Sequence, residues 1–343
     1  MSEYKELIIS CFIVVGVAVS WACSTQFTKS ALSLDSRRFY APYTLVWFNT
    51  SFMTLCFPVY LLYNHIRNKT SIRESYRDAS TVFGKPMLRN AILRVTPFLV
   101  MWVAPNYSYS QSLGHISASA ASSILSSNTV IVCLLSWAIL KEPLLISRCV
   151  AVILAVAGVV IISLDREFTA SAIGIGLALF SALTAAIYKV GFKFVNGNAT
   201  LGQVSLFMST LGAIDLCLNS IPTGILVYTG ADHIELGYIP WLPLVGAALL
   251  SMMFNFLVNF GIALLNPLVI SVGMVSGLPL NIAIDIVFRG IQTTPTFLVG
   301  STFIIVSFVL TTFPCEEKVK KWLSSRGNID IRNDIHEVRY QNP

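Results

Sequence analysis

Charged side chains are scarce in this sequence. Only 12% of its 343 residues are Asp, Glu, Lys or Arg, whereas 55% are hydrophobic. Soluble domains typically carry about 25% charged residues. A water-soluble protein of this length could not bury so much apolar side chain, because the ratio of surface to volume falls too slowly as the chain grows. The scarcity of charge therefore excludes an ordinary soluble domain, and lipid is expected to be the solvent for most of the chain.

Catalytic and metal-binding patterns are also missing from the sequence. The four histidines are scattered, and neither an H-E-x-x-H pattern nor a phosphate-cradling glycine loop is present. The seven cysteines lack metal-ligand spacing, and most of them lie in apolar stretches where they are expected to pack. We therefore expect no enzyme activity, no catalytic residue, no metal site and no cofactor.

The sequence does contain a series of long apolar segments, separated by Gly, Pro and clusters of charge. A helix needs about 20 mostly apolar residues to cross a bilayer, and it satisfies its own backbone hydrogen bonds in lipid. These segments predict an all-α membrane protein of about ten transmembrane helices, the first of them a span and not a cleavable leader. The predicted spans lie near residues 7–32, 40–63, 91–113, 118–140, 144–164, 172–192, 202–228, 241–264, 268–288 and 297–313.

The distribution of basic residues predicts the orientation. Most of the 23 Lys and Arg residues, Lys189 and Lys193 among them, fall on one side of a ten-span arrangement. Because short cytosolic loops carry an excess of basic residues, we expect both termini in the cytosol, with a short segment at 1–6 and a flexible tail at 314–343. The net charge of +6 is then a signal of topology, so no nucleic-acid partner is expected. We expect the protein in the plasma membrane or in a Golgi or other internal membrane. Since Asn68 and Asn198 are expected on the cytosolic side, neither is expected to carry a glycan.

The chain divides into two halves of five spans each, at 7–164 and 172–313. An odd number of spans per half gives the halves opposite orientations, which is the inverted repeat of many secondary transporters. Weak internal similarities favour this division. They join residues 20–29 (SWACSTQFTK) with 181–189 (SALTAAIYK), and residues 117–128 (SASAASSILSSN) with 270–281 (ISVGMVSGLPLN).

Polar side chains within the predicted spans are the candidate binding residues, because polar groups are costly inside a bilayer. Asn and Ser in membrane helices also serve as interhelical contacts, worth about 0.6 kcal/mol each. Asp215 is the most informative, since it has no basic neighbour in sequence, whereas Asp285 precedes Arg289 by one helical turn and is expected to pair with it. The predicted substrate-binding residues are Trp21, Thr25, Trp47, Trp102, Asn106, Tyr107, Tyr109, Asn128, Tyr188, Asp215, Asn259 and Asn281.

Short motifs along nearly the whole chain resemble a known family. They are residues 20–29, 41–48 (APYTLVWF), 106–109 (NYSY), 134–137 (LLSW), 186–190 (AIYKV), 259–263 (NFGIA) and 277–281 (GLPLN). The chain resembles the drug/metabolite transporter superfamily with its EamA-type repeats, and within it solute carrier family 35, subfamily F, in the branch associated with thiamine transport. The resemblance implies ten helices, cytosolic termini and alternating access around a central site. One departure is the stretch 126–129 (SSNT), where that branch has an aromatic residue after the asparagine.

The resemblance implies thiamine as the substrate, and the residue chemistry favours a cation of this kind. Thiamine is an aromatic cation, which aromatic faces and a carboxylate such as Asp215 would bind. A nucleotide sugar is a dianion, and the basic residues near the membrane, Lys29, Arg94 and Lys189, are expected toward span ends. We therefore expect a carrier for thiamine or a similar organic cation. Membrane lipids are expected to surround the protein, and a homodimer is possible from the sequence. The alternatives are a nucleotide-sugar or organic-anion exchanger of the Golgi and a non-transporting receptor or scaffold.

Overall fold

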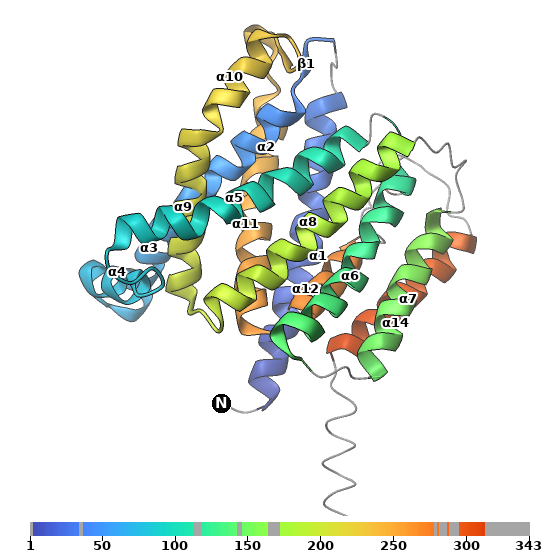
Figure 1. Ribbon diagram of the computed structural model, residues 1–343, viewed down its shortest axis with the longest axis horizontal. Coiled ribbons are helices and arrows are strands. Elements are labelled where there is room, and N and C mark those ends of the chain that lie inside the picture. Colours follow the sequence, from blue (N-terminus) through green and yellow to red (C-terminus); the bar gives the residue numbers. More distant parts are fainter. Residues whose placement is uncertain are drawn as a thin grey trace, which may run out of the picture.

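The computed structural model describes residues 3–33, 37–112, 115, 118–142, 146–163, 172–265, 267–277, 280, 287 and 295–312, and most of these are helical (Figure 1). The two-residue strands β1 (Phe39–Tyr40) and β2 (His233–Ile234) form an antiparallel pair. The elements in the first predicted half are α1 (Glu3–Ser33), α2 (Pro42–Ser51), η1 (Phe52–Leu55), α3 (Cys56–Asn68), α4 (Ile72–Ser80), α5 (Met87–Ser112), α6 (Ala118–Leu140) and α7 (Ile146–Ser163). The elements in the second predicted half are α8 (Ala172–Asn196), α9 (Leu201–Leu218), α10 (Ser220–Tyr228), η2 (Leu236–Tyr238), α11 (Trp241–Leu264), α12 (Pro267–Val275) and α14 (Pro295–Thr312).

In the described part of the chain, six helical segments are long and apolar enough to cross a membrane. They are Ile8–Thr28, Pro42–Asn68, Met87–Ser112, Ala172–Asn196, Leu201–Leu218 and Trp241–Leu264. Shorter apolar helices occupy Ser127–Leu140, Cys149–Gly158 and Leu298–Ser307. The prediction of an all-α, multi-pass membrane protein is confirmed. A helix overlaps each of the ten predicted ranges, but ten crossings remain a prediction.

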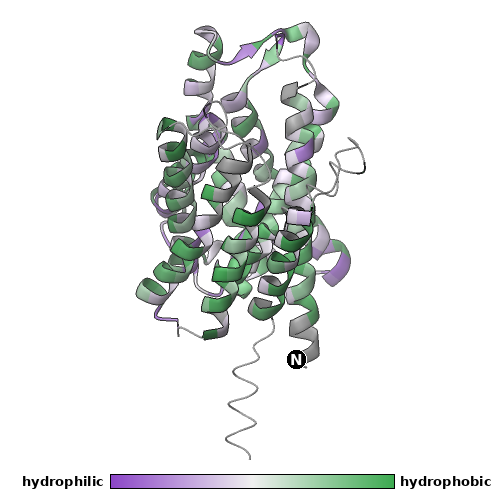
Figure 2. Ribbon diagram, turned by 90° about the vertical axis from the view of Figure 1, so that its right-hand side faces the viewer, coloured by the Kyte–Doolittle hydropathy of each residue, from purple (hydrophilic) through white to green (hydrophobic). Residues whose placement is uncertain are grey.

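The outer surface of the bundle is apolar, as a lipid-facing surface must be. Large hydrophobic side chains such as Phe12, Leu62, Ile153 and Leu242 are more than half exposed. Hydrophobic residues predominate along the helices in Figure 2. Soluble proteins rarely expose so much contiguous apolar surface.

Within the described residues, two predicted spans are interrupted. The range 40–63 is built from α2 and α3 with the 3-10 turn η1 between them, and the range 202–228 from α9 and α10. The first interruption lies where η1 crosses α9. There the Ser209 hydroxyl donates to the Thr54 carbonyl at 2.6 Å and accepts from the Phe57 amide at 2.8 Å. Sequence periodicity missed the turn, because a side chain from the other half satisfies the freed backbone groups.

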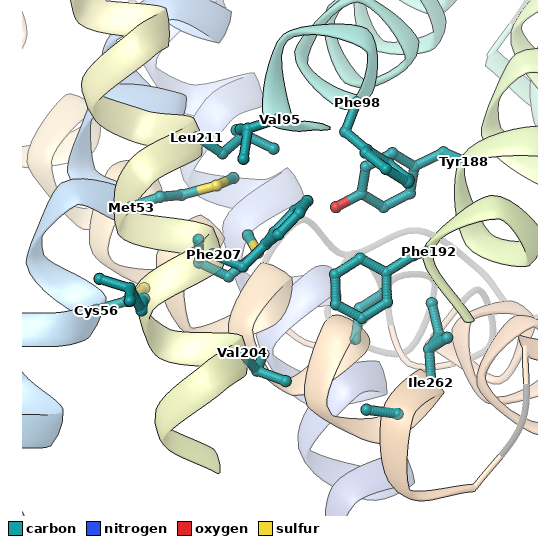
Figure 3. Close-up of a cluster of buried hydrophobic side chains, with 14 of the residues drawn as sticks. Met53, Cys56, Val95, Phe98, Tyr188, Phe192, Val204, Phe207, Leu211 and Ile262 are labelled. Carbon is teal, nitrogen blue, oxygen red and sulfur yellow. The ribbon is translucent and has the colours of Figure 1, made fainter. Parts of the chain in front are cut away.

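Aromatic packing fixes α5, α8 and α9 against one another (Figure 3). Phe98 meets Phe207 edge-on with ring centroids 5.4 Å apart, and Phe192 meets Phe207 in the same way at 5.2 Å. Tyr188 lies 5.8 Å from Phe98. These rings are all buried, so they form the centre of the largest apolar cluster.

The helix packing has a regular pattern. Helix α1 of the first predicted half packs on α11 and α12 of the second, and α8 of the second packs on α5 and α6 of the first. Helix α7 packs on its counterpart α14. Exchanging each span for its counterpart five spans away converts the first set of contacts into the second. The cross-helix hydrogen bonds follow the same exchange, because Ser181 donates to the Pro105 carbonyl on α5 at 2.8 Å and Ser24 donates to the Ala247 carbonyl on α11 at 3.3 Å. Two related halves predict this regularity, and their inverted arrangement remains a prediction.

Candidate functional site

About half of the predicted binding residues fall into three polar groups between helices of the bundle. One group joins α2, α5, α8 and α11, the second joins α2, α5 and α9, and the third joins α6, α8 and α12. Each group contains residues from both predicted halves. Polar groups at such positions in transporters commonly bind the solute near the midplane.

The first group is centred on Trp102 and Tyr188. The Trp102 indole donates to the Thr50 hydroxyl at 3.2 Å, and its ring lies 5.4 Å from the Tyr188 ring. The Tyr188 hydroxyl donates to Asn259 Oδ1 at 2.8 Å, and both Tyr188 and Asn259 are buried. Two aromatic faces and a buried amide therefore meet where the halves touch. Trp102 points into the bundle, since it packs against the central apolar cluster.

Buried polar atoms without a partner lie on α2 and α11 beside this group. In the described part of the chain, Trp47 Nε1, Asn49 Oδ1 and Asn255 Oδ1 are buried and make no hydrogen bond. The Asn255 amide nitrogen does donate to the Ser251 hydroxyl, at 3.2 Å. An unmatched buried polar atom costs about 1–3 kcal/mol. Such atoms are the ones that a bound solute can pair with, so they mark α2 and α11 as candidate walls of the site.

The second group surrounds Asp215. This carboxylate is fully buried and accepts hydrogen bonds from the Asn219 amide at 2.6 Å and from the Ser51 hydroxyl at 3.3 Å. The Tyr43 hydroxyl donates to Asn219 Oδ1 at 3.4 Å, and the Tyr43 ring packs edge-on against Tyr107 at 5.3 Å. Among the residues that the structure describes, no basic side chain forms an ion pair with Asp215. A carboxylate beside two aromatic rings is suited to an organic cation.

The third group surrounds Lys189, and it corrects an expectation. Lys189 was expected toward a span end on the cytosolic side, but it lies well inside α8 with only 5% of its surface exposed. Its ammonium donates to Asn128 Oδ1 at 2.8 Å and to the Ser271 hydroxyl at 3.0 Å. The Asn128 amide donates to the Ala182 carbonyl at 2.8 Å. The sequence could have indicated that Lys189 is buried within a helix, because the predicted span 172–192 already includes this lysine.

Two further predicted residues are bonded within their own helices. The Asn106 amide donates to the Trp102 carbonyl at 2.7 Å, and the Thr25 hydroxyl donates to the Trp21 carbonyl at 2.8 Å. Hydroxyl and amide groups often return to the preceding turn in this way. Trp102 and Asn106 therefore lie on the same face of α5, but the Asn106 amide nitrogen already donates a hydrogen bond within this helix.

The remaining predicted residues lie apart from the three groups. Tyr109 packs beside Ala178 and Ile124 in a small separate cluster. Trp21 lies against Gly277, so closely that a Cβ on the glycine would be 2.6 Å from Trp21 Cε3. Asn281, Asp285 and Arg289 lie outside the described residues, and so does the predicted tail 314–343. The described residues contain no group of three or more His, Cys, Asp or Glu side chains able to hold a metal ion.

Comparison with known proteins identifies the family. Residues 8–164 match the EamA-like transporter family. The chain is 34% identical to solute carrier family 35 member F3 of Homo sapiens over 89% of its own length and 74% of that protein. It is also 34% identical to member F4 of Homo sapiens, over 89% of this chain and 59% of that protein, and 25% identical to an uncharacterized transporter of Schizosaccharomyces pombe.

Structural comparison agrees with the sequence comparison. A solved structure, described only as a crystal structure of a protein, superposes with a TM-score of 0.66, covering 88% of this chain and 96% of that chain. Its sequence identity of 12% shows a common fold and nothing more. The matched family and the identity and extent of the relatives lead to one assignment: the chain belongs to subfamily F of solute carrier family 35, among the EamA-like proteins of the drug/metabolite transporter superfamily.

Proposed function

We propose that this membrane solute transporter carries an aromatic organic cation, with thiamine as the first candidate. The observation that carries the proposal is Asp215, which is fully buried without a basic partner in the described part of the chain. An unpaired charge inside a bilayer is costly, and such residues commonly bind a charged solute or a proton. A cationic solute would supply the missing charge.

The aromatic rings beside the carboxylate support the same substrate class. Tyr43 and Tyr107 lie on the Asp215 side, and Trp102 and Tyr188 lie at the next polar group. Thr50 and Ser51, neighbours on α2, connect the two groups through their hydrogen bonds to Trp102 and Asp215. A cation over an aromatic face gains about 2 kcal/mol or more when it is desolvated.

The packing pattern supports transport by alternating access. The polar groups lie between helices of the two predicted halves, 7–164 and 172–313, and the helix contacts repeat when the halves are exchanged. When two halves are inverted, one conformation can open the site to one side of the membrane. The conformation in which the two halves exchange their shapes then opens the site to the other side. Ten spans and cytosolic termini belong to this proposal.

A second candidate is an exchanger of organic anions or nucleotide sugars, and Lys189 favours it. The ammonium is buried and held by two neutral groups, and among the described residues no acidic side chain forms an ion pair with it. An anionic group on the solute would neutralise this charge. The two candidates therefore depend on different residues and can be separated.

The test is uptake of radiolabelled thiamine into vesicles that contain the purified protein. We expect saturable uptake by the natural protein and a loss of roughly tenfold or more in Asp215→Asn, because one buried charge pair is worth several kcal/mol. Exposed Asp78→Asn is the matched control and should transport normally. Undiminished uptake by Asp215→Asn would remove the proposed counter-charge.

The same vesicles separate the alternatives. Exchange of a nucleotide sugar for a nucleoside monophosphate, lost in Lys189→Met and kept in Lys193→Met, would establish the anion exchanger instead. Lys193 is the suitable control, because it lies one turn further along α8 and its ammonium reaches the Ala263 carbonyl and Asn198. No flux of either class of solute would favour the receptor or scaffold.

A further inference from the structure

The connection between α3 and α5 folds onto the edge of the bundle as a compact corner (Figure 1). Its helix α4 packs on α3 and α9, and Ser75 and Ala79 form the buried side of this helix. Phe83 is fully buried and stacks on Phe207 of α9, with ring centroids 6.3 Å apart. Arg94 of α5 donates to the Val82 carbonyl at 2.8 Å. The corner is therefore anchored to three helices and holds its outer side in a fixed position.

The outer side of this corner is strongly basic. Two acidic residues, Glu74 and Asp78, lie within the same segment and are exposed. Arg77 Nε lies 3.9 Å from Asp78 Oδ1, with both side chains mostly exposed, so this pair neutralises little. The basic residues, all exposed, are Arg67, Lys69, Arg73, Arg77, Lys85 and Arg89.

Around α4 the side chains are sorted by character. Successive residues of a helix are about 100° apart, so residues four apart share a face. Starting from the buried face, the next sector carries Ile72 and Tyr76, which are 55% and 43% exposed. The sector after that carries Arg73 and Arg77, and the acidic residues lie on the far flank. An exposed apolar strip beside a basic strip is the pattern of a helix that lies at a membrane interface.

The level of the corner in the bilayer agrees with this pattern. The apolar segment Pro42–Asn68 is long enough to span the membrane and ends at the corner. Arg67 is in its last turn, and Lys69 follows directly in a left-handed conformation with φ of 53°. Basic residues that directly follow a span lie at the depth of the lipid headgroups. The exposed apolar side chains Ile66 and Leu88 extend the surface that can contact acyl chains.

We propose that this basic corner, formed by Arg67, Lys69, Arg73, Arg77, Lys85 and Arg89 around α4, binds the anionic headgroups of membrane lipids. Anionic lipid supplies the negative charge that the protein lacks here, and the apolar strip of α4 sits beside the acyl chains. Because Phe83 joins the corner to the aromatic cluster of α5, α8 and α9, lipid bound outside stabilises packing at the centre of the bundle. This binding site is separate from the proposed solute site and does not depend on its substrate.

The test measures the melting temperature of the purified full-length protein in detergent during titration with phosphatidylserine or with phosphatidylcholine of the same chains. A ligand that binds the folded state raises stability, so phosphatidylserine should raise the melting temperature at lower concentrations than phosphatidylcholine. In Arg73→Gln/Arg77→Gln the half-effective concentration of phosphatidylserine should rise roughly tenfold or more, since each basic residue near the surface adds about a fivefold preference. Salt at about 1 M should remove the preference by screening.

The matched control is Arg37→Gln/Lys141→Gln, which removes two exposed positive charges outside the corner and should respond to lipid like the natural protein. All four side chains are exposed, so both double variants should melt like the natural protein without lipid. The proposal is overturned by an equal response to the two lipids, by an unchanged response in Arg73→Gln/Arg77→Gln, or by an equal loss in the control. A preference that survives high salt would likewise contradict headgroup charge as its cause.

Discussion

Replacing Gly212 with alanine should destabilise the crossing that positions Asp215. At this glycine α9 meets η1 so closely that a Cβ would lie 2.5 Å from the Thr54 backbone nitrogen and 2.8 Å from the Thr54 hydroxyl. The third nearest atom is the Met53 carbonyl carbon, at 3.1 Å. Two of these three atoms belong to the backbone, which cannot rotate away as a long side chain can. The helices must therefore separate.

The size of the effect follows from two opposed terms. Overpacking a tight contact costs about 1–3 kcal/mol. Alanine in place of glycine inside a helix gains up to about 1 kcal/mol. The same gain without the clash is expected for Gly224→Ala in α10, where an added Cβ meets nothing within 4 Å. The two variants should therefore differ by about 1–3 kcal/mol, because the helix-propensity gain is common to both.

The assay is thermal unfolding of the two purified variants beside the natural protein. A difference of 1 kcal/mol shifts the melting temperature of a large domain by roughly 2–4 °C. Gly212→Ala should melt several degrees below Gly224→Ala, and its solute transport should fall as well, since Asp215 lies one helical turn further along α9. Equal melting temperatures for the two variants would show that the crossing is loose and would refute the close-contact reasoning.

Two further outcomes are expected. Tyr188→Phe should destabilise the protein by about 1–3 kcal/mol in thermal unfolding, because it leaves the buried Asn259 oxygen without its 2.8 Å hydrogen bond, whereas exposed Tyr63→Phe should have little effect. A stable Tyr188→Phe would mean that the hydroxyl bond is dispensable. In sealed microsomes, a membrane-impermeant maleimide should label a cysteine at exposed Lys69→Cys and spare one at exposed Gly237→Cys. The opposite pattern would invert the predicted orientation.

Helix positions could be predicted from the sequence because one rule governs them. A span must be apolar over its whole length and must satisfy its own backbone, so hydropathy alone located α1, α5, α8 and α11 to within a few residues. Interruptions such as η1 were invisible, because they depend on a contact with a residue about 150 positions away, Ser209. No local pattern reports such a contact.

The candidate site could be predicted only in composition. The cost of polar groups inside a bilayer selected Trp102, Tyr188, Asn259 and Asp215, and all four face the interior of the bundle, while their role in binding stays a prediction. It did not show how they are grouped, since grouping depends on helix rotation and crossing. Lys189 was misjudged because basic residues were counted by side of the membrane, whereas the depth within the helix decides its environment.

The polar contacts between the predicted halves are individually weak, which suits them to be broken and formed again. Ser51 reaches Asp215 at 3.3 Å, and Asn128 holds Lys189 at 2.8 Å. Interhelical hydrogen bonds of this kind in membranes are worth about 0.6 kcal/mol on average. In the proposed alternating access, apolar packing between the halves would tolerate rocking, because it has no direction, whereas each polar contact would have to break as the halves move. A solute that replaces the partner of a buried charge would compensate for that break, so an occupied transporter would change conformation more easily than an empty one. The charges at these contacts would thereby couple solute binding to transport.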